Sequence, residues 1–169
     1  MNRSKRDLEF MSHALYEAEI AYHIGQLPIA AVLVINGKEI DIRRNSSFNH
    51  GNLFDHAENL LIQKNSIKIK EASEARKSIE LFTTLEPCLQ CFGAAVHNRF
   101  TRIVYACPDP AAGSTHISPP TEWYRIRWPE IVRGPLARES YDIFMKFIEQ
   151  DPEAWKDIIR LYRELEPRI

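Results

Sequence analysis

Four side chains in two short motifs constrain this chain more than any other feature of its sequence. His56 and Glu58 stand in a His-Ala-Glu motif, and Cys88 and Cys91 stand further along the chain in Pro-Cys-Leu-Gln-Cys. A catalytic zinc ion takes three protein ligands and leaves its fourth position open for water. A carboxylate beside the ion can carry that water's proton. The two motifs therefore predict that distant segments fold together around one zinc ion and perform hydrolytic chemistry.

The spacing within each motif predicts how such a site assembles. Cys88 and Cys91, three residues apart on a helix, point about 60° apart and can face one ion. Pro87 suits a helix start, where free N–H groups and the helix dipole favour thiolates. His56 and Glu58 would diverge by about 200° within a regular helix. They can share a site only if His56 lies at the very start of its helix, so we expect two helix starts to meet at the ion.

The hydrophobic pattern predicts alternating helices and strands. Asn36-Gly37, between two apolar-rich runs, is the strongest short signal for a β-hairpin. The expected strands cover residues 29–35, 39–43, 79–84, 103–106 and 129–132. The expected helices cover residues 4–24, 56–64, 88–98, 137–150 and a last helix that begins at Asp151-Pro152. This order predicts a mixed sheet that a hairpin opens, with parallel crossovers and helices on both faces.

A single domain accounts for the whole chain, residues 1–169, with a core over 4–150 and a helical extension over 151–169. The length of 169 residues suffices to bury a core without disulfides. Residues 45–54, 65–77 and 107–128 are expected to be loops, the second with some helix. The length and proline content of the third suggest a functional role. The extension carries one apolar stripe, interpreted as packing or dimer surface: Trp155, Ile158, Ile159, Tyr162 and Leu165.

Composition places the chain among ordinary globular proteins of a reducing compartment. Apolar residues make up 44%, charged residues 27%, and the formal net charge is -1, which argues against a nucleic-acid-binding surface over the whole domain. Local basic patches at 64–70 and 125–127 are conceivable, although solvated faces are the simpler interpretation. Three cysteines do not make a disulfide framework. The charged first ten residues and the lack of a long apolar run predict a cytoplasmic protein without membrane contact.

The two motifs, in this order and each after a strand, match the signature of zinc deaminases. The chain resembles the cytidine deaminase superfamily, and within it the branch of bacterial tRNA adenosine deaminases and guanine deaminases. The resemblance runs from about Leu8 to Gln150 and is densest at 28–34, 56–58 and 84–94. It implies a three-layer α/β/α fold, a five-stranded mixed sheet with an antiparallel first hairpin, and a homodimer.

The resemblance also implies a role for each site residue. His56, Cys88 and Cys91 would hold one zinc ion per chain. Glu58 would move a proton from the attacking water to a ring nitrogen and to the leaving ammonia, so that a carbonyl replaces a ring amino group. The residues expected to contact the substrate base are Asn45, Asp109, Ile29 and Ala57. Asn45 and Asp109 also suit turns, so a purely structural role is the alternative for both.

Several positions depart from the family pattern and leave the substrate open. These departures are Ala30, Arg44, Gln90 and the segment Leu53-Phe54-Asp55. The balanced charge and the longer C-terminal half favour a small nucleobase or nucleoside, of purine type such as guanine or adenine, or of cytosine type. Adenosine-to-inosine deamination in tRNA is the alternative. An RNA substrate would normally require several Lys and Arg side chains near the mouth of the pocket. We expect Asp55 to cap the helix that follows rather than to support a zinc ligand.

Three other classes of protein share parts of this pattern. A structural zinc site would need a fourth protein ligand, for which Cys107 or His97 is available. A redox Cys-x-x-Cys also follows a strand, but it does not account for His56 and Glu58. A non-catalytic zinc-binding subunit of the same fold would not need all four motif residues.

Overall fold

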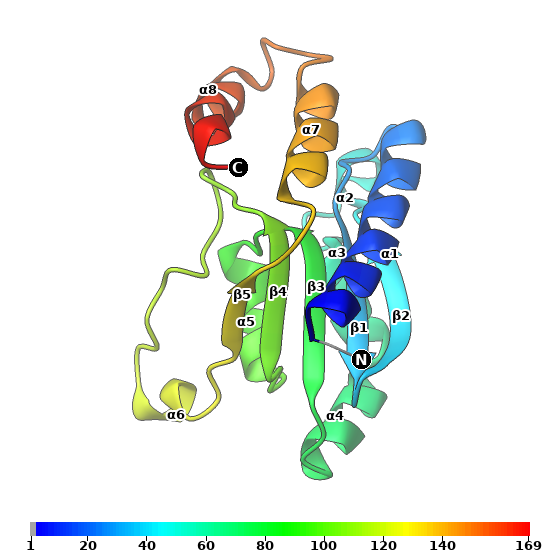
Figure 1. Ribbon diagram of the computed structural model, residues 1–169, viewed down its shortest axis with the longest axis vertical. Helices are drawn as coiled ribbons and strands as arrows, with labels where there is room; N and C mark the ends of the chain where they lie inside the picture. Colours follow the sequence, from blue (N-terminus) through cyan, green and yellow to red (C-terminus); the bar gives the residue numbers. More distant parts are fainter. Residues whose placement is uncertain (1–2) are drawn as a thin grey trace.

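A five-stranded mixed sheet forms the middle layer of the computed structural model, which describes residues 3–169 except for the side chains of 49 and 50 (Figure 1). The strands lie in the order β2-β1-β3-β4-β5. Their bounds are β1 Ala30–Ile35, β2 Lys38–Arg44, β3 Ile79–Leu85, β4 Arg102–Cys107 and β5 Glu130–Arg133. β1 runs antiparallel to β2 and β3, whereas β3, β4 and β5 are parallel. The predicted fold class is confirmed.

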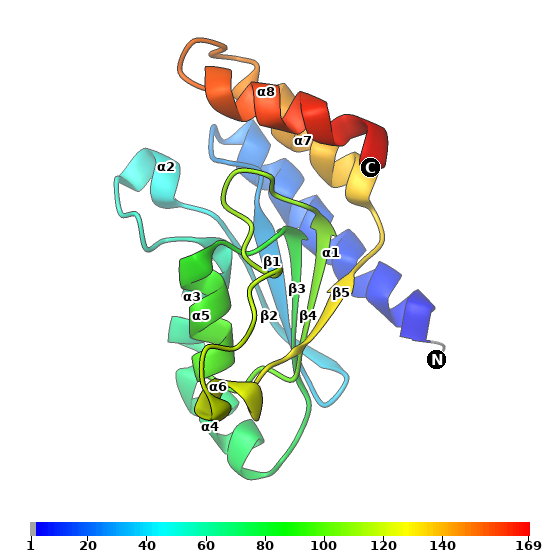
Figure 2. The same cartoon turned by 90° about the vertical axis from the view of Figure 1, so that its left-hand side faces the viewer.

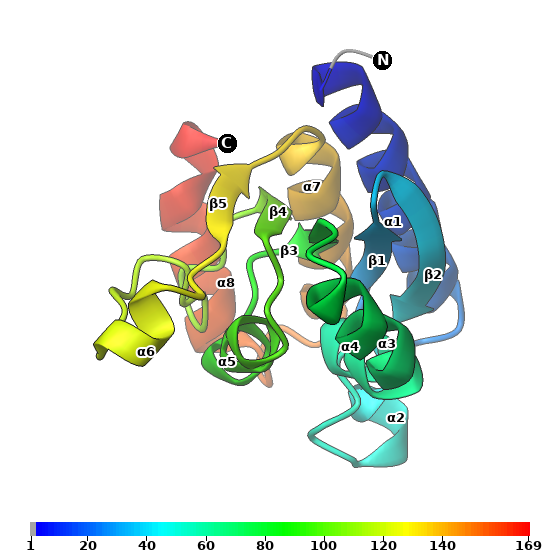
Figure 3. The ribbon, with the colours of Figure 1, turned by 90° about the horizontal axis from the view of Figure 1, so that it is seen from below.

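Helices cover both faces of this sheet, as Figure 3 shows end-on. α1 (Arg3–His23) and α7 (Ala137–Ile148) pack on one face. α3 (Ala57–Lys64), α4 (Ser66–Glu74) and α5 (Leu89–His97) lie on the other. The remaining helical segments are α2 (Ser47–His50), α6 (Glu122–Arg125), α8 (Lys156–Leu165) and the 3₁₀ turn η1 (Glu166–Arg168). None of the described helices has the length and apolar character that a bilayer crossing requires.

The two faces of the sheet are apolar because side chains alternate along each strand. Val32 and Val34 of β1 pack with Phe10 and Met11 of α1. The intervening residues of β1 pack on the opposite side, with the cluster around α3 and α5. Every residue of β3 is buried, since this central strand is covered from both sides. The sheet is therefore a rigid support for the segments that follow the carboxyl ends of β3 and β4.

The turn between β1 and β2 has the expected chemistry. Asn36 and Gly37 both adopt positive φ, 51° and 76°. Two consecutive positive φ angles define the type I′ turn, whose twist matches that of paired strands. The hairpin prediction from Asn-Gly is thus confirmed, and the pairing of Ile35 with Lys38 closes it.

Four segments differ from the prediction. Residues 65–77, expected to be mainly a loop, contain α4, which buries only Ile69 and Ala72 and so left a weak periodic signal. Residues 45–54 contain the short helix α2, and residues 107–128 contain the short helix α6. The last helix begins at Lys156 instead of Asp151, because Asp151 Oδ1 accepts a hydrogen bond from the backbone N–H of Ala154 and holds a turn there.

The C-terminal extension packs on the domain through its predicted stripe. α8 and its flanks join α7 and the carboxyl ends of β3 and β4 in one apolar cluster that includes Leu85, Cys107, Phe144 and Tyr162. Tyr162 is fully buried, and its ring lies 4.8 Å from that of Phe144. Figure 2 shows α8 crossing beside α7 at the end of the sheet where β3 and β4 terminate.

A buried ion cluster lies at the opposite end of the sheet. Arg102 donates to both carboxylate oxygens of Asp7, at 2.9 and 2.5 Å, and to Glu80 at 3.3 Å. Arg6 also binds Glu80, at 2.6 Å. The side chains of Arg102 and Glu80 are only 5% and 4% exposed, so each charge depends on its partners. This cluster joins α1 to the starts of β3 and β4.

Replacing Arg102 with methionine is expected to lower the free energy of unfolding by about 3 kcal/mol, because it leaves two buried carboxylates with Arg6 alone. Urea unfolding followed by circular dichroism measures this. Arg125→Met removes an equally charged side chain from an exposed pair with Glu122 and should change the midpoint far less. Equal effects of the two substitutions would contradict a stabilising role for the buried cluster.

Candidate zinc site

The predicted zinc ligands meet where two helices begin. His56 is the N-cap of α3, with φ −70° and ψ 147°. Cys88 is the N-cap of α5, with φ −68° and ψ 168°. Both residues have extended backbone conformations, so their side chains point in directions that a helical residue could not adopt. Cys91 follows in the first turn of α5. Because α3 packs against α5, the two helix starts are adjacent.

The donor atoms fit a tetrahedral zinc ion. His56 Nδ1 lies 3.5 Å from Cys88 Sγ and 3.4 Å from Cys91 Sγ, and the three ligand atoms all lie within 4.8 Å of one another. Usual zinc–nitrogen and zinc–sulfur distances with tetrahedral angles imply roughly 3.6 Å between a nitrogen and a sulfur ligand. One imidazole and two thiol groups also form the donor set that zinc prefers.

The protonation states of the three ligands are coupled. The pKa of the Cys88 thiol falls to about 4 because the Cys91 thiol donates a hydrogen bond to it. The same pairing raises the pKa of Cys91, and burial raises it further. The pKa of His56 is raised, chiefly by its hydrogen bond with Cys88. One thiolate is therefore already present at neutral pH, which favours capture of a cation.

Glu58 lies beside the ligands in a buried position. It is 3% exposed, and burial raises the pKa of its carboxyl. Its Oε1 accepts a hydrogen bond of 3.2 Å from Thr83 Oγ1 on β3, while the Cys91 thiol interacts with the same carboxylate. No motif in the sequence marks Thr83, although it stands in the strand that leads to the cysteine motif.

No fourth protein ligand joins the three within the part of the chain that the structure describes. Cys107 is buried and donates to the carbonyl oxygen of Pro108. His97 lies at the other end of α5, where its ring faces Trp123 at 5.7 Å. The two residues that could have closed a structural site are thus engaged elsewhere. The arrangement of three ligands matches a catalytic zinc site with one open position.

Among the predicted substrate contacts, Asn45 and Ile29 are joined to each other through the backbone. The N–H of Asn45 donates to the carbonyl oxygen of Ile29 at 2.8 Å. Asn45 is 2% exposed, and its Oδ1 accepts from the N–H and the hydroxyl of Ser47, each at 3.0 Å. Asn45 thereby holds the start of α2, and Ile29 packs with the C-terminal cluster.

The other two predicted contacts differ in their surroundings. Ala57, the first residue of α3, is fully buried between the two motif residues. Asp109 follows β4, and its Oδ1 accepts from the N–H groups of Ala111 and Ala112 at 2.9 and 3.2 Å. Burial raises the pKa of the Asp109 carboxyl. Its observed contacts organise a turn, and a role in binding the substrate stays a prediction.

The expectation for Asp55 was wrong. Its Oδ1 accepts from Asn52 Nδ2 at 2.7 Å, and α3 has no side-chain cap on its first N–H groups. The N-cap of α3 is His56, one residue later than a capping Asp55 requires. An asparagine three residues upstream competes successfully for the carboxylate, so Asp55 shapes the preceding loop instead.

Glu86, which was not among the predicted site residues, ties the predicted functional loop to the cysteine motif. Its Oε1 accepts from the N–H and the hydroxyl of Thr115, at 3.0 and 2.6 Å. Its Oε2 accepts from the N–H of Asp109 at 3.1 Å. The N–H and hydroxyl of Ser114 bind the carbonyl oxygen of Pro87 at 3.1 and 2.9 Å. The loop after β4 is thus fixed beside Cys88.

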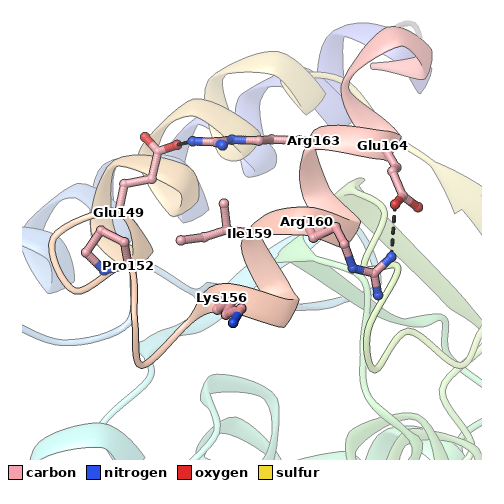
Figure 4. Close-up of a pocket in the computed structure, with 7 residues that line it drawn as sticks. All are labelled: Glu149, Pro152, Lys156, Ile159, Arg160, Arg163 and Glu164. Atoms are coloured by element: carbon pink, nitrogen blue, oxygen red, sulfur yellow. Dashed lines mark hydrogen bonds and ion pairs between the residues drawn. The ribbon is translucent and has the colours of Figure 1, made fainter.

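α8 touches both loops that border the site. Trp155, at its start, lies 6.2 Å from the ring of Phe48 in α2. Tyr162 lies close enough to Asp109 for each group to influence the other's pKa. A hollow of about 720 Å³ also lies against α8 (Figure 4), but none of the predicted site residues lines it. The cations Arg160 and Arg163 in this hollow are paired with Glu164 and Glu149.

Comparison with known families agrees with this geometry. The model of the cytidine and deoxycytidylate deaminase zinc-binding region matches residues 4–107, which is more than half of the chain. The chain belongs to this family of zinc-binding deaminases, and zinc is its cofactor. The matched segment contains His56, Glu58, Cys88 and Cys91.

Two curated relatives match more than four fifths of the chain. The tRNA-specific adenosine deaminase of Bacillus subtilis (strain 168) is 35% identical over 148 residues, which are 86% of this chain and 90% of the relative. The tRNA-specific adenosine deaminase of Rickettsia felis is 30% identical over 149 residues, 83% of this chain and 99% of the relative.

Solved structures share the fold. One from a study of A-to-I editing by tRNA:A34 deaminases has a TM-score of 0.61 at 29% identity and covers 80% of this chain and 99% of its own. The guanine deaminase from Nitrosomonas europaea has a TM-score of 0.60 at 18% identity and covers 82% of both chains. The chain is thus a deaminase by family and by fold.

Two glycine substitutions test the link between Glu86 and the loop after β4. A Cβ on Gly113 would lie 2.5 Å from the Glu86 carboxyl group and from the Asp109 carbonyl oxygen. Gly113→Ala is therefore expected to lower the free energy of unfolding by about 2 kcal/mol and to reduce activity. A Cβ on Gly93 in α5 meets nothing within 4 Å, so Gly93→Ala should stabilise the helix by up to about 1 kcal/mol.

Urea unfolding of the zinc-loaded variants measures both changes. If Gly113→Ala were as stable and active as Gly93→Ala, the close packing of the loop against Glu86 would be refuted.

Proposed function

We propose that His56, Cys88 and Cys91 hold the zinc ion and that Glu58 is the proton carrier of a hydrolytic deamination. When bound, zinc supplies a Lewis acid that acidifies a coordinated water. Two thiolates offset much of the ion's charge, so a base beside the ion is needed as well. The observation that carries the proposal is the buried Glu58 next to three converging ligands.

The surroundings of Glu58 suit a group that both accepts and releases protons. Burial raises its pKa above that of an exposed carboxyl, and a general acid–base group is most effective when its pKa lies closer to neutral pH. The Thr83 hydroxyl orients one carboxylate oxygen. Glu58 would take a proton from the attacking water and pass protons to the ring nitrogen and to the departing amine. Water adds to the ring carbon, ammonia leaves, and a carbonyl remains.

We further propose that the substrate is an adenosine within an RNA chain. Support comes from curated relatives that cover most of this chain, such as the two tRNA-specific adenosine deaminases at 30% and 35% identity. The small-substrate interpretation drawn from the net charge is the second candidate. It is favoured by α8, whose residues lie against Phe48 of α2 and near Asp109, so that both segments bordering the site are covered.

A homodimer is proposed as well. Leu53 and Phe54, just before His56, are 78% and 62% exposed, and Leu89, just after Cys88, is 65% exposed. Large apolar side chains on both flanks of one site suit a surface that a second copy covers. A cytoplasmic location stays a prediction from composition.

Glu58→Gln is expected to keep one zinc ion per chain and to lose activity by a factor of about 10²–10⁴, because the amide cannot carry the proton. Zinc is measured by elemental analysis and turnover by ammonia release. His56→Ala is the contrasting variant and should lose both zinc and activity. A Glu58→Gln enzyme with full turnover would remove Glu58 from the mechanism, and a wild-type chain that binds zinc without any turnover would favour the non-catalytic subunit.

The substrate proposal is tested by offering the enzyme free purines, pyrimidines and their nucleosides beside a tRNA transcript with adenosine in its anticodon loop. We expect inosine in the transcript, detected by nuclease digestion and mass spectrometry, with little ammonia from the free compounds. Fast release from a free base or nucleoside, together with an unmodified transcript, would establish the small-molecule alternative instead.

A further inference from the structure

A groove of about 380 Å³ lies at the end of α5 that is remote from the zinc site. Four cations line it, and none of its lining residues is acidic; the cations are Arg76, Lys77, Arg99 and Arg127. They come from three segments, namely the end of α4, the end of α5 and the stretch after α6. Figure 3 looks onto this end of the molecule, where α4, α5 and α6 lie below the sheet.

The charges in this groove are not neutralised. No carboxylate among the described residues forms an ion pair with any of the four groove cations. Of the basic positions that the sequence suggested, Lys64 pairs with Asp41 and Arg125 pairs with Glu122, whereas Arg127 lies in the groove. The folded chain thus joins Arg127 to three cations from other segments, a grouping that sequence spacing did not indicate.

Two of the arginines occupy positions where glycine is usual. Arg76 and Arg99 have φ of 53° and 61°. Each lies just beyond the end of a helix, where backbone N–H groups donate hydrogen bonds to carbonyl oxygens of the last helical turn. A left-handed residue other than glycine is strained. Cations stabilise helix C-termini, which explains in part why arginine occupies these two positions. Helix stabilisation does not explain the presence of Lys77 and Arg127 in the same groove.

Arg127 is held in place by an aromatic ring. Its guanidinium carbon lies 3.9 Å from the ring centroid of Trp123, and its Nη1 donates to the Trp123 carbonyl oxygen at 2.8 Å. The side chain is therefore ordered before any ligand arrives, which lowers the entropy lost on binding. An ordered, planar guanidinium suits a phosphate group.

We propose that this groove binds the phosphate backbone of the RNA substrate, away from the base that reacts. The inference rests on the proposed RNA function. α5 has nine residues, so the groove lies on the order of 14 Å along the helix from the zinc ligands, a distance that a structured RNA spans. The hollow against α8 is a weaker candidate for this role because its two arginines are already paired with glutamates.

The test combines Arg76→Gly with Arg99→Gly in the Glu58→Gln background, so that RNA is bound without being consumed. Binding of a fluorescently labelled RNA hairpin is followed by anisotropy over a range of salt concentrations. We expect affinity to fall on the order of tenfold and the slope of log K against log salt to become shallower by roughly 1.5, for two lost phosphate contacts. Glycine also relieves the left-handed strain, so the melting temperature should not fall.

The matched control is Arg125→Gln with Arg138→Gln in the same background. These cations are exposed and already paired with Glu122 and Glu166, so RNA binding should hardly change. Unchanged binding by the groove variant, or an equal loss in the control, would overturn the proposal.

Failure of the groove and failure of the RNA function give different results. Inosine formed equally well by the wild-type chain and by Arg76→Gly/Arg99→Gly at every salt concentration overturns the groove alone. Weaker hairpin binding by the groove variant, with no inosine in any RNA, supports the groove as a phosphate-binding site and refutes RNA as the substrate of deamination.

Discussion

The meeting of two helix starts at the carboxyl ends of the central strands is the interaction on which the site depends. His56 and Cys88 are both extended N-cap residues, so their side chains reach one point that regular helical geometry would deny to them. The point lies where free N–H groups and helix dipoles favour anions. Two thiolates and a buried carboxylate can therefore stand close together, and a zinc ion makes that concentration of negative charge favourable.

Contacts from the rest of the fold hold these two helix starts in position. β3 is buried along its whole length and delivers Thr83 to Glu58 and Cys88 to the ligand set. At the end of this strand, Glu86 accepts three hydrogen bonds from the loop after β4. One carboxylate thus couples the cysteine motif to Asp109, and Gly113 must lack a side chain to allow it. α8 closes over the same region from the other side.

Charge is distributed unevenly over a chain that is nearly neutral overall. At one end, Arg102 is enclosed by carboxylates and serves stability. Beside it, Arg76, Lys77, Arg99 and Arg127 line a groove without acidic residues. A net charge of -1 therefore says little about whether one surface attracts a polyanion. Folding decides which cations are paired and which remain available.

The sequence by itself determined the fold class and the Asn36-Gly37 hairpin and singled out the three candidate zinc ligands, since apolar periodicity, turn chemistry and metal-ligand spacing are local properties of the chain. It also required His56 to begin its helix. Only the tertiary structure decided that Thr83 and Glu86 support the site, that Asn52 takes Asp55 from the helix cap, and that cations from three segments share one groove. Most of these contacts join different segments of the chain, and packing selects which partner each side chain meets, which spacing within one segment does not encode.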